Sequence, residues 1–203
     1  MARRTKEEAE ETRQLLMKTA LRLFSDQGIQ TTTLAAVARE AGVTRGAIYW
    51  HFKDKADMLE ALWDKIMQPM ELVYEKLRGD VSGDPLLVLE QIAESFFLLA
   101  ASNEDFQQVL KITMQSQSDP LLAERCQQLC REEMESLSSL MTQARDKGIL
   151  RTDLSVKGAS LTYYGFIEGV AGNWLNSGCD PLLVEEARPI ARVLIQGLRK
   201  TPN

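Results

Sequence analysis

The sequence predicts an all-α protein built from nine helices. Apolar residues recur at spacings of three and four along most of the chain, as they do on the buried face of a helix. Threonine or aspartate precedes several of these segments, and glycine or proline separates them, which is how helices are capped and ended. No segment shows the alternation of apolar and polar residues that is typical of a half-buried strand.

The composition is that of a globular protein that buries a core. Of the 203 residues, 44% are hydrophobic and 26% are charged, which argues against a disordered chain. The net charge of −5 is unevenly distributed, because residues 1–60 carry +1 and residues 61–203 carry −6. Salt screens charges that lie more than about 8–10 Å apart, so the local balance of the N-terminal part decides which partners it attracts.

The N-terminus carries basic residues without the apolar segment of an export signal behind them. The longest apolar runs, such as residues 96–101, are too short to span a bilayer. We therefore expect a cytoplasmic protein without membrane association. The cysteines Cys126, Cys130 and Cys179 are odd in number and are expected to be reduced, inert thiols.

The first helix is expected to begin after the short basic N-terminal segment. Thr5 and Glu8 have the spacing of a capping box. Gly28 is expected to end the helix. Its buried face consists of apolar residues at positions i, i+4, i+7 and i+8, namely Leu16, Ala20, Leu23 and Phe24.

Two short helices joined by a tight turn are expected next, in the segment TTTLAAVAREAGVTRGAIYWHFKDK at residues 31–55. Thr32 or Thr33 caps the first and Thr44 caps the second, because a hydroxyl accepts hydrogen bonds from the free amides at a helix start. Gly42 forms the turn. Small apolar residues hold the pair together: Leu34, Val37, Ala38, Ala41, Ile48 and Phe52. This arrangement is typical of a helix-turn-helix, whose second helix enters a DNA groove.

A fourth, longer helix follows, with Asp54 as its cap and Asp57 in its first turn. Pro69 lies inside it and is expected to kink or interrupt it. Further helices are expected near residues 85–101, 104–116, 120–147, 156–176 and 181–199. We therefore predict a helix-turn-helix domain at residues 1–54 and a larger helical domain at residues 55–203.

The outward side chains of the second short helix suit contacts with DNA. Arg45 matches O6 and N7 of guanine, and Tyr49, one turn later on the same face, packs on a sugar or a thymine methyl. Gly46 lets the backbone approach closely, and Trp50 either covers the DNA backbone or packs on the domain itself. Phosphate contacts are expected from residues at helix starts and from basic side chains: Thr33, Thr44, His51, Lys53 and Lys55.

The segment at residues 31–55 resembles the N-terminal signature of the TetR family of transcriptional regulators. The opening MARRTKEEAEETR together with GVTRGAIYWHFKDK resembles its AcrR-type branch, which represses multidrug efflux pumps. The resemblance is dense over roughly the first 60 residues. It implies a repressor that binds a near-palindromic operator in double-stranded DNA as a homodimer, with two heads about 34–36 Å apart. It also implies that a small apolar or cationic effector, such as a drug, releases the repressor from the operator.

The resemblance further implies that the larger domain binds this effector. Methionine and aromatic side chains make adaptable walls for varied apolar ligands, although plain core packing is the alternative for each of them. A carboxylate in the apolar run YYGFIEGV is the exception, since it either holds a cationic drug, pairs with Asn173 or faces a dimer seam. The candidate effector residues are Trp63, Met67, Met70, Phe97, Ile112, Gln115, Met134, Tyr163, Tyr164, Ile167 and Glu168.

A stripe of small residues on the eighth helix suits close approach of another helix, either within the chain or across a four-helix dimer interface formed with the ninth helix. The resemblance favours the dimer. The residues of this expected interface are Gly165, Gly169, Gly172, Val184, Ile190, Val193 and Leu194.

The sequence contains no nucleophile elbow, no phosphate-binding loop and no second histidine, so we expect neither an enzyme nor a cofactor. Three other functions stay open at this point. In the first, the regulator responds to an endogenous metabolite. In the second, it activates transcription instead of repressing it. In the third case the chain is a helical ligand-binding or scaffold protein whose head contacts protein instead of DNA.

Overall fold

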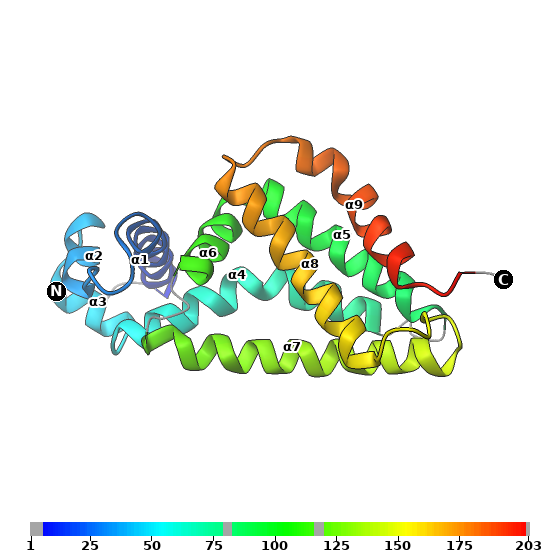
Figure 1. Ribbon diagram of the computed structural model, residues 1–203. Helices are drawn as coiled ribbons and strands as arrows, with labels where there is room; N and C mark the ends of the chain where they lie inside the picture. The colour runs from blue at the N-terminus through cyan, green and yellow to red at the C-terminus, as the bar shows by residue number, and fades with distance from the viewer. Residues whose placement is uncertain (1–5, 79–82, 116–119, 202–203) are drawn as a thin grey trace. The chain divides into compact units, whose positions relative to one another are not determined.

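The computed structural model describes residues 6–78, 83–115 and 120–201. Within them it contains nine α-helices (Figure 1): α1 Lys6–Gln27, α2 Leu34–Glu40, α3 Arg45–His51, α4 Lys55–Arg78, α5 Pro85–Ser102, α6 Glu104–Gln115, α7 Pro120–Asp146, α8 Val156–Asn176 and α9 Leu182–Leu198. The prediction of an all-α protein is confirmed, and each predicted range agrees with a helix to within one or two residues.

Two details differ from the prediction. Pro69 does not interrupt α4, which continues through it. The described residues also contain one isolated antiparallel bridge, between Leu150 and Arg199, which no pattern in the sequence predicted.

The chain forms two compact units. The first contains the residues up to Met67 together with Gln108–Glu124, and the second contains Gln68–Gln107 and the residues from Arg125 onwards. This division by contacts is not the division by function predicted at residue 54, which stays a prediction. Each unit is described here by itself.

The first unit packs α1, α2 and α3 against one another. Ile48 and Phe52, predicted to point inward, are 0% and 1% exposed, and Leu16 and Phe24 of α1 are also buried. An ion pair of 2.5 Å between Arg22 and Glu40 joins the surfaces of α1 and α2. The three helices therefore share one apolar core.

The ends of these helices follow the predicted local rules. Gly28 ends α1 and Gly42 forms the next turn, at φ values of 84° and 69° that favour glycine. Thr33, and not Thr32, caps α2, because its Oγ1 accepts from the amide of Ala36 at 3.1 Å. Thr44 caps α3 in the same way. The predicted cap of α1, Thr5, lies outside the described residues.

Thr32 has a different role in the same turn. Its side chain is buried, and its hydroxyl donates to the carbonyl of Gly28 at 2.8 Å. The hydroxyl therefore satisfies a backbone acceptor behind the end of α1, which leaves the neighbouring threonine to cap α2.

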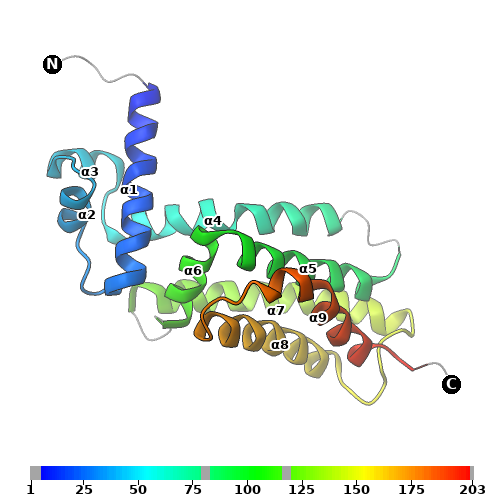
Figure 2. The same ribbon diagram turned by 90° about the horizontal axis from the view of Figure 1, so that it is seen from above.

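The second unit is organised around α5, with α8 and α9 packed against it. Figures 1 and 2 both show α9 running beside α5. By length and composition α5 is apolar enough to cross a membrane, but its Leu86, Leu89 and Phe97 are buried in the unit. The hydroxyl of Tyr163 in α8 donates to the carbonyl of Leu89 at 2.8 Å, which fixes α8 against α5.

Candidate nucleic-acid interface

The outer face of α3 is exposed, whereas its inner face fills the core. Arg45 and Gly46 lie on the surface, and 48% of Tyr49 is accessible. The guanidinium carbon of Arg45 lies 5.9 Å from the centre of the Tyr49 ring, so the cation rests on the aromatic face. This contact holds the guanidinium on the outer side of the helix.

Trp50 stands next to this pair and is the most exposed large apolar side chain of the described residues, at 72%. Its ring meets the His51 ring edge to face, with centroids 4.5 Å apart. Trp50 is therefore not buried in the core, and its ring contacts the surface of the head through His51. Its contact with the DNA backbone stays a prediction.

The five residues expected to contact phosphate are all at least partly accessible. Thr33 and Thr44 are exposed, and each hydroxyl already accepts an amide hydrogen bond, so its own proton is available to an incoming oxygen. Lys53 is also exposed, and His51 is half-buried. Thr33 and Thr44 lie at the starts of α2 and α3, where free helix amides favour anions. His51 is the last residue of α3, and Lys53 lies between α3 and α4.

Lys55 differs from the other predicted contacts. Its Nζ donates to the carbonyl oxygen of Ile29 at 2.6 Å and to that of Thr32 at 3.2 Å. The ammonium is therefore directed at the protein's own turn between α1 and α2, a placement that the sequence did not indicate.

Comparison with known proteins identifies this arrangement. The family model described as bacterial regulatory proteins, tetR family, matches residues 16–62, and the model of the YsiA-like protein C-terminal region matches residues 63–197. The chain is also 34% identical to the HTH-type transcriptional regulator AcrR of Shigella flexneri, over 97% of this chain and 93% of that protein. The chain belongs to the TetR family.

Two further relatives of this TetR-family protein match it over almost its whole length. The HTH-type transcriptional repressor BepR of Brucella suis is 31% identical over 99% of this chain and 98% of that protein. The crystal structure of NalD, the secondary repressor of the MexAB-OprM multidrug efflux pump in Pseudomonas aeruginosa, has a TM-score of 0.81 at 28% identity, covering 97% of this chain and 100% of that one. These matches confirm the prediction of a DNA-binding transcriptional repressor, and such regulators are not enzymes.

The predicted effector residues of this TetR-family repressor divide between the two units. Trp63, Met67 and Ile112 belong to the first unit, and the side chain of Gln115 lies outside the described residues. The others belong to the second unit, where four are buried and three are half-buried: Met70, Phe97, Tyr163 and Ile167, then Met134, Tyr164 and Glu168.

Two carboxylates come together in the second unit. Burial raises the pKa of Glu133 on α7 to about 7, and the nearby charge of Glu168 on α8 adds to this increase. Burial also raises the pKa of Glu168. Tyr164 lies near both groups, and burial together with their negative charge raises the pKa of its phenol. These acidic groups on α7 and α8 are therefore half-buried and close enough for the charge of one to raise the pKa of another.

Sequence reasoning found Glu168 but missed Glu133. Glu133 lies in the charged segment REEMES, which is typical of a solvent-exposed helix face. Glu168 interrupts an apolar segment, so it is easier to recognise as unusual. The signal was nevertheless present, because Cys130, Glu133 and Leu137 are spaced i, i+3 and i+7 on one face of α7, with Met134 beside them. The suggested pairing of Glu168 with Asn173 is not observed, because the Asn173 amide donates to the carbonyl of Gly169 at 2.8 Å.

The thiols add no further site to these groups. Cys130 and Cys179 are free cysteines, and the side chain of Cys126 lies outside the described residues. Cys130 lies near the Tyr164 phenol and contributes to the increase in its pKa.

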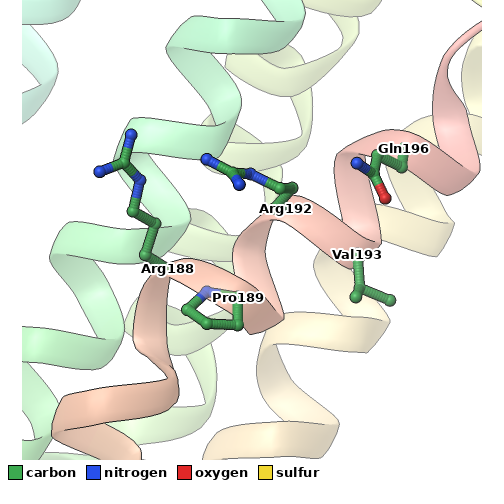
Figure 3. Close-up of a pocket in the computed structure, with 5 residues that line it drawn as sticks. All are labelled: Arg188, Pro189, Arg192, Val193 and Gln196. Carbon is green, nitrogen blue, oxygen red and sulfur yellow. The ribbon is translucent and has the colours of Figure 1, made fainter.

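The surface expected to form a dimer is partly exposed in the single chain. Gly165 and Gly169 lie on the surface of α8, but Gly172 is buried, so the predicted stripe is shorter than expected. On α9, Val184 and Val193 are exposed, whereas Leu194 belongs to the core. An open hollow of about 410 Å³ lies on α9. Figure 3 shows the side chains that line it, Arg188, Pro189, Arg192, Val193 and Gln196.

Proposed function

We propose that this TetR-family repressor controls a multidrug efflux operon from the cytoplasm, binds a near-palindromic operator as a homodimer, and is released by a small apolar cation. The whole-length likeness to NalD, a repressor of a multidrug efflux pump, carries the choice of target. The observation that carries the choice of effector is the pair of half-buried carboxylates on α7 and α8.

The operator is read by α3. Arg45 contacts a guanine, and the Tyr49 ring beneath it keeps the guanidinium oriented, which reduces the rotamer freedom lost on binding. Trp50 covers the sugar–phosphate backbone, and the small Gly46 permits close approach. Four residues around the helix starts and the end of α3 bind phosphates and set the register: Thr33, Thr44, His51 and Lys53.

The effector carries a positive charge on an apolar body. A buried carboxylate is costly without a partner, and two adjacent carboxylates repel each other. A cation between Glu133 and Glu168 removes both penalties, and the neighbouring tyrosines offer aromatic surface to its apolar part. The remaining candidate residues, including Trp63, Met67, Ile112 and Gln115, stay a prediction.

Release from DNA requires that the effector bind the non-operator-binding state more tightly. The helix that begins directly after the DNA-reading segment, α4, is continuous from the first unit into the second. α6 and α7 also run from one unit into the other, but α4 alone begins directly after α3, so we infer that α4 carries a change beside α7 and α8 to the head.

Dimerisation uses the exposed parts of α8 and α9. The exposed Gly165 and Gly169 permit close helix approach, and the apolar Val184 and Val193 supply surface that is costly to leave in water. A dimer doubles the operator contacts and places two copies of α3 about 34–36 Å apart.

A gel-shift experiment tests the proposal. The probe is the DNA upstream of the transporter genes that flank this gene, and the effectors are tetraphenylphosphonium and the isosteric anion tetraphenylborate. We expect a specific shift that the cation abolishes and the anion does not. No shift on any flanking intergenic DNA rejects the efflux target, and equal release by both ions rejects the carboxylate site.

A further inference from the structure

The turn between α1 and α2 contains backbone carbonyls that accept hydrogen bonds from side chains. α1 ends at Gln27, and α2 begins after Thr33. The carbonyls of residues 28–32, between these two helices, therefore take no part in the hydrogen bonds of a helix. The carbonyl of Gln27 accepts from the Thr31 hydroxyl, and that of Gly28 accepts from the Thr32 hydroxyl at 2.8 Å.

Lys55 supplies the donors for the next acceptors of this turn. Its Nζ lies 2.6 Å from the carbonyl oxygen of Ile29, 3.2 Å from that of Thr32 and 3.5 Å from that of Gln30. An ammonium has three protons; two of these carbonyls lie within ordinary hydrogen-bond distance of it and the third lies at the limit. A phosphate oxygen would compete with these carbonyls for the protons.

Lys55 is also the first residue of a helix whose start is rigidly held. The carboxylate of Asp54 accepts from the amide of Asp57 at 2.9 Å, and the carboxylate of Asp57 accepts from the amide of Lys53 at 2.8 Å. Just before this turn, Phe52 donates its amide to Ile48 and is buried in the core of the first unit. The end of α3 and the start of α4 are therefore joined without an unbonded hinge.

We propose that Lys55 is a positioning residue for DNA recognition: its ammonium fixes the α1–α2 turn, and through it the capped start of α2, to the junction of α3 and α4. The four elements then form one rigid head. The DNA-facing residues at the starts of α2 and α3 keep a constant spacing, and a displacement of α4 moves the whole head. This role rests on DNA binding by the family and on neither the operon nor the effector proposed above.

Lys53 provides the matched control. It lies two residues before Lys55, is exposed, and its backbone amide, rather than its ammonium, forms the hydrogen bond to Asp57. K55M and K53M both remove one positive charge and keep a long apolar stem, so they differ in the hydrogen bonds that each substitution removes. K55Q, which keeps two donors on a shorter side chain, is the milder variant if K55M does not fold.

Two measurements on the full-length chain separate positioning from phosphate binding. The first is hydrogen exchange of the DNA-free protein over residues 28–38. The second is the salt dependence of binding to a duplex of about 30 base pairs that the wild-type protein selects from a random library, long enough for two half-sites with flanks. A phosphate contact contributes about 0.9 to the slope of log K against log salt.

For K55M we expect exchange over residues 28–38 to rise about tenfold, because the turn no longer has its hydrogen bonds to a charged group. We expect its operator affinity to fall about tenfold with the salt slope of the wild type. For K53M we expect unchanged exchange and a slope smaller by about 0.9 for each phosphate that the Lys53 ammonium neutralises in the wild type.

Two results would overturn the proposal. If K55M leaves exchange unchanged and lowers the slope as K53M does, Lys55 is a phosphate ligand. If exchange rises while affinity stays at the wild-type value, the lysine stabilises the turn without positioning the DNA-reading residues. Failure of the wild-type protein to select any duplex counts against DNA binding itself, and the exchange measurement then still decides whether Lys55 holds the turn.

Discussion

The buried carboxylate of Glu133 makes the stability of the protein depend on pH in a direction opposite to that of an ordinary surface acid. Its pKa is about 7 in the folded protein, against 4.5 for an unperturbed glutamate. Between these values the folded protein holds a proton that the unfolded chain has released. The contribution to stability is therefore complete below pH 4.5 and is lost as the pH rises to 7.

The size of the effect follows from the two pKa values. Each pKa unit corresponds to about 1.4 kcal/mol, so the free energy of unfolding falls by about 3 kcal/mol between pH 4.5 and pH 7 through this one group. E133Q keeps the shape of the protonated side chain and removes the titration. We expect E133Q and wild type to be similar in stability near pH 5, and E133Q to be more stable by about 3 kcal/mol at pH 8.

Urea unfolding at half-unit steps between pH 5 and pH 8 measures the difference between the two proteins, with circular dichroism as the signal. E132Q is the control, since Glu132 lies on the same turn of α7 but is exposed. A stability difference between E133Q and wild type that does not change with pH over this range would refute the reasoning.

Four other predictions concern binding and packing. Tetraphenylphosphonium affinity, measured by calorimetry, should rise about tenfold from pH 6 to pH 8 as Glu133 loses its proton, and E133Q should abolish this dependence. Arg45→Ala should cost about 1–3 kcal/mol of operator binding and relax the preference at one base pair, which repeated selection from random DNA detects. Thr44→Ala should destabilise the protein by about 1 kcal/mol in urea unfolding, whereas Thr44→Asn should not, because asparagine also caps helices. Tyr163→Phe removes the side-chain donor to the carbonyl of Leu89, whose helical amide donor remains, and should cost about 0.5–1.5 kcal/mol, measured in the same way.

The parts of the fold that depend on neighbours in sequence were predictable. Thr44 and Gly42 act within one turn of the chain, so their roles as cap and turn follow from residue type and position alone. The division of α3 into an inner face with Ile48 and Phe52 and an outer face with Arg45 follows from helical periodicity. The same local rules gave the helix boundaries throughout the described chain.

The parts that depend on distant neighbours were not predictable in this way. The choice between Thr32 and Thr33 as the cap is decided by burial behind the end of α1. The three carbonyl partners of Lys55 lie 23 to 26 residues away, so an exposed lysine was the natural expectation. The spacing of Glu133 indicates which face of α7 it lies on, but it does not indicate that the charge of Glu168 on α8 lies nearby.

The separation of faces on α3 has a consequence for how such a protein can change its target. The residues that face outward, Arg45, Tyr49 and Trp50, contribute little to the core, while Ile48 and Phe52 carry the packing of the helix. If these residues read the operator as proposed, substitutions on the outer face change the recognised sequence with little loss of folding free energy. Evolution or design can then direct this repressor to a new promoter by substituting the outer residues of α3, while the inner residues keep the helix packed.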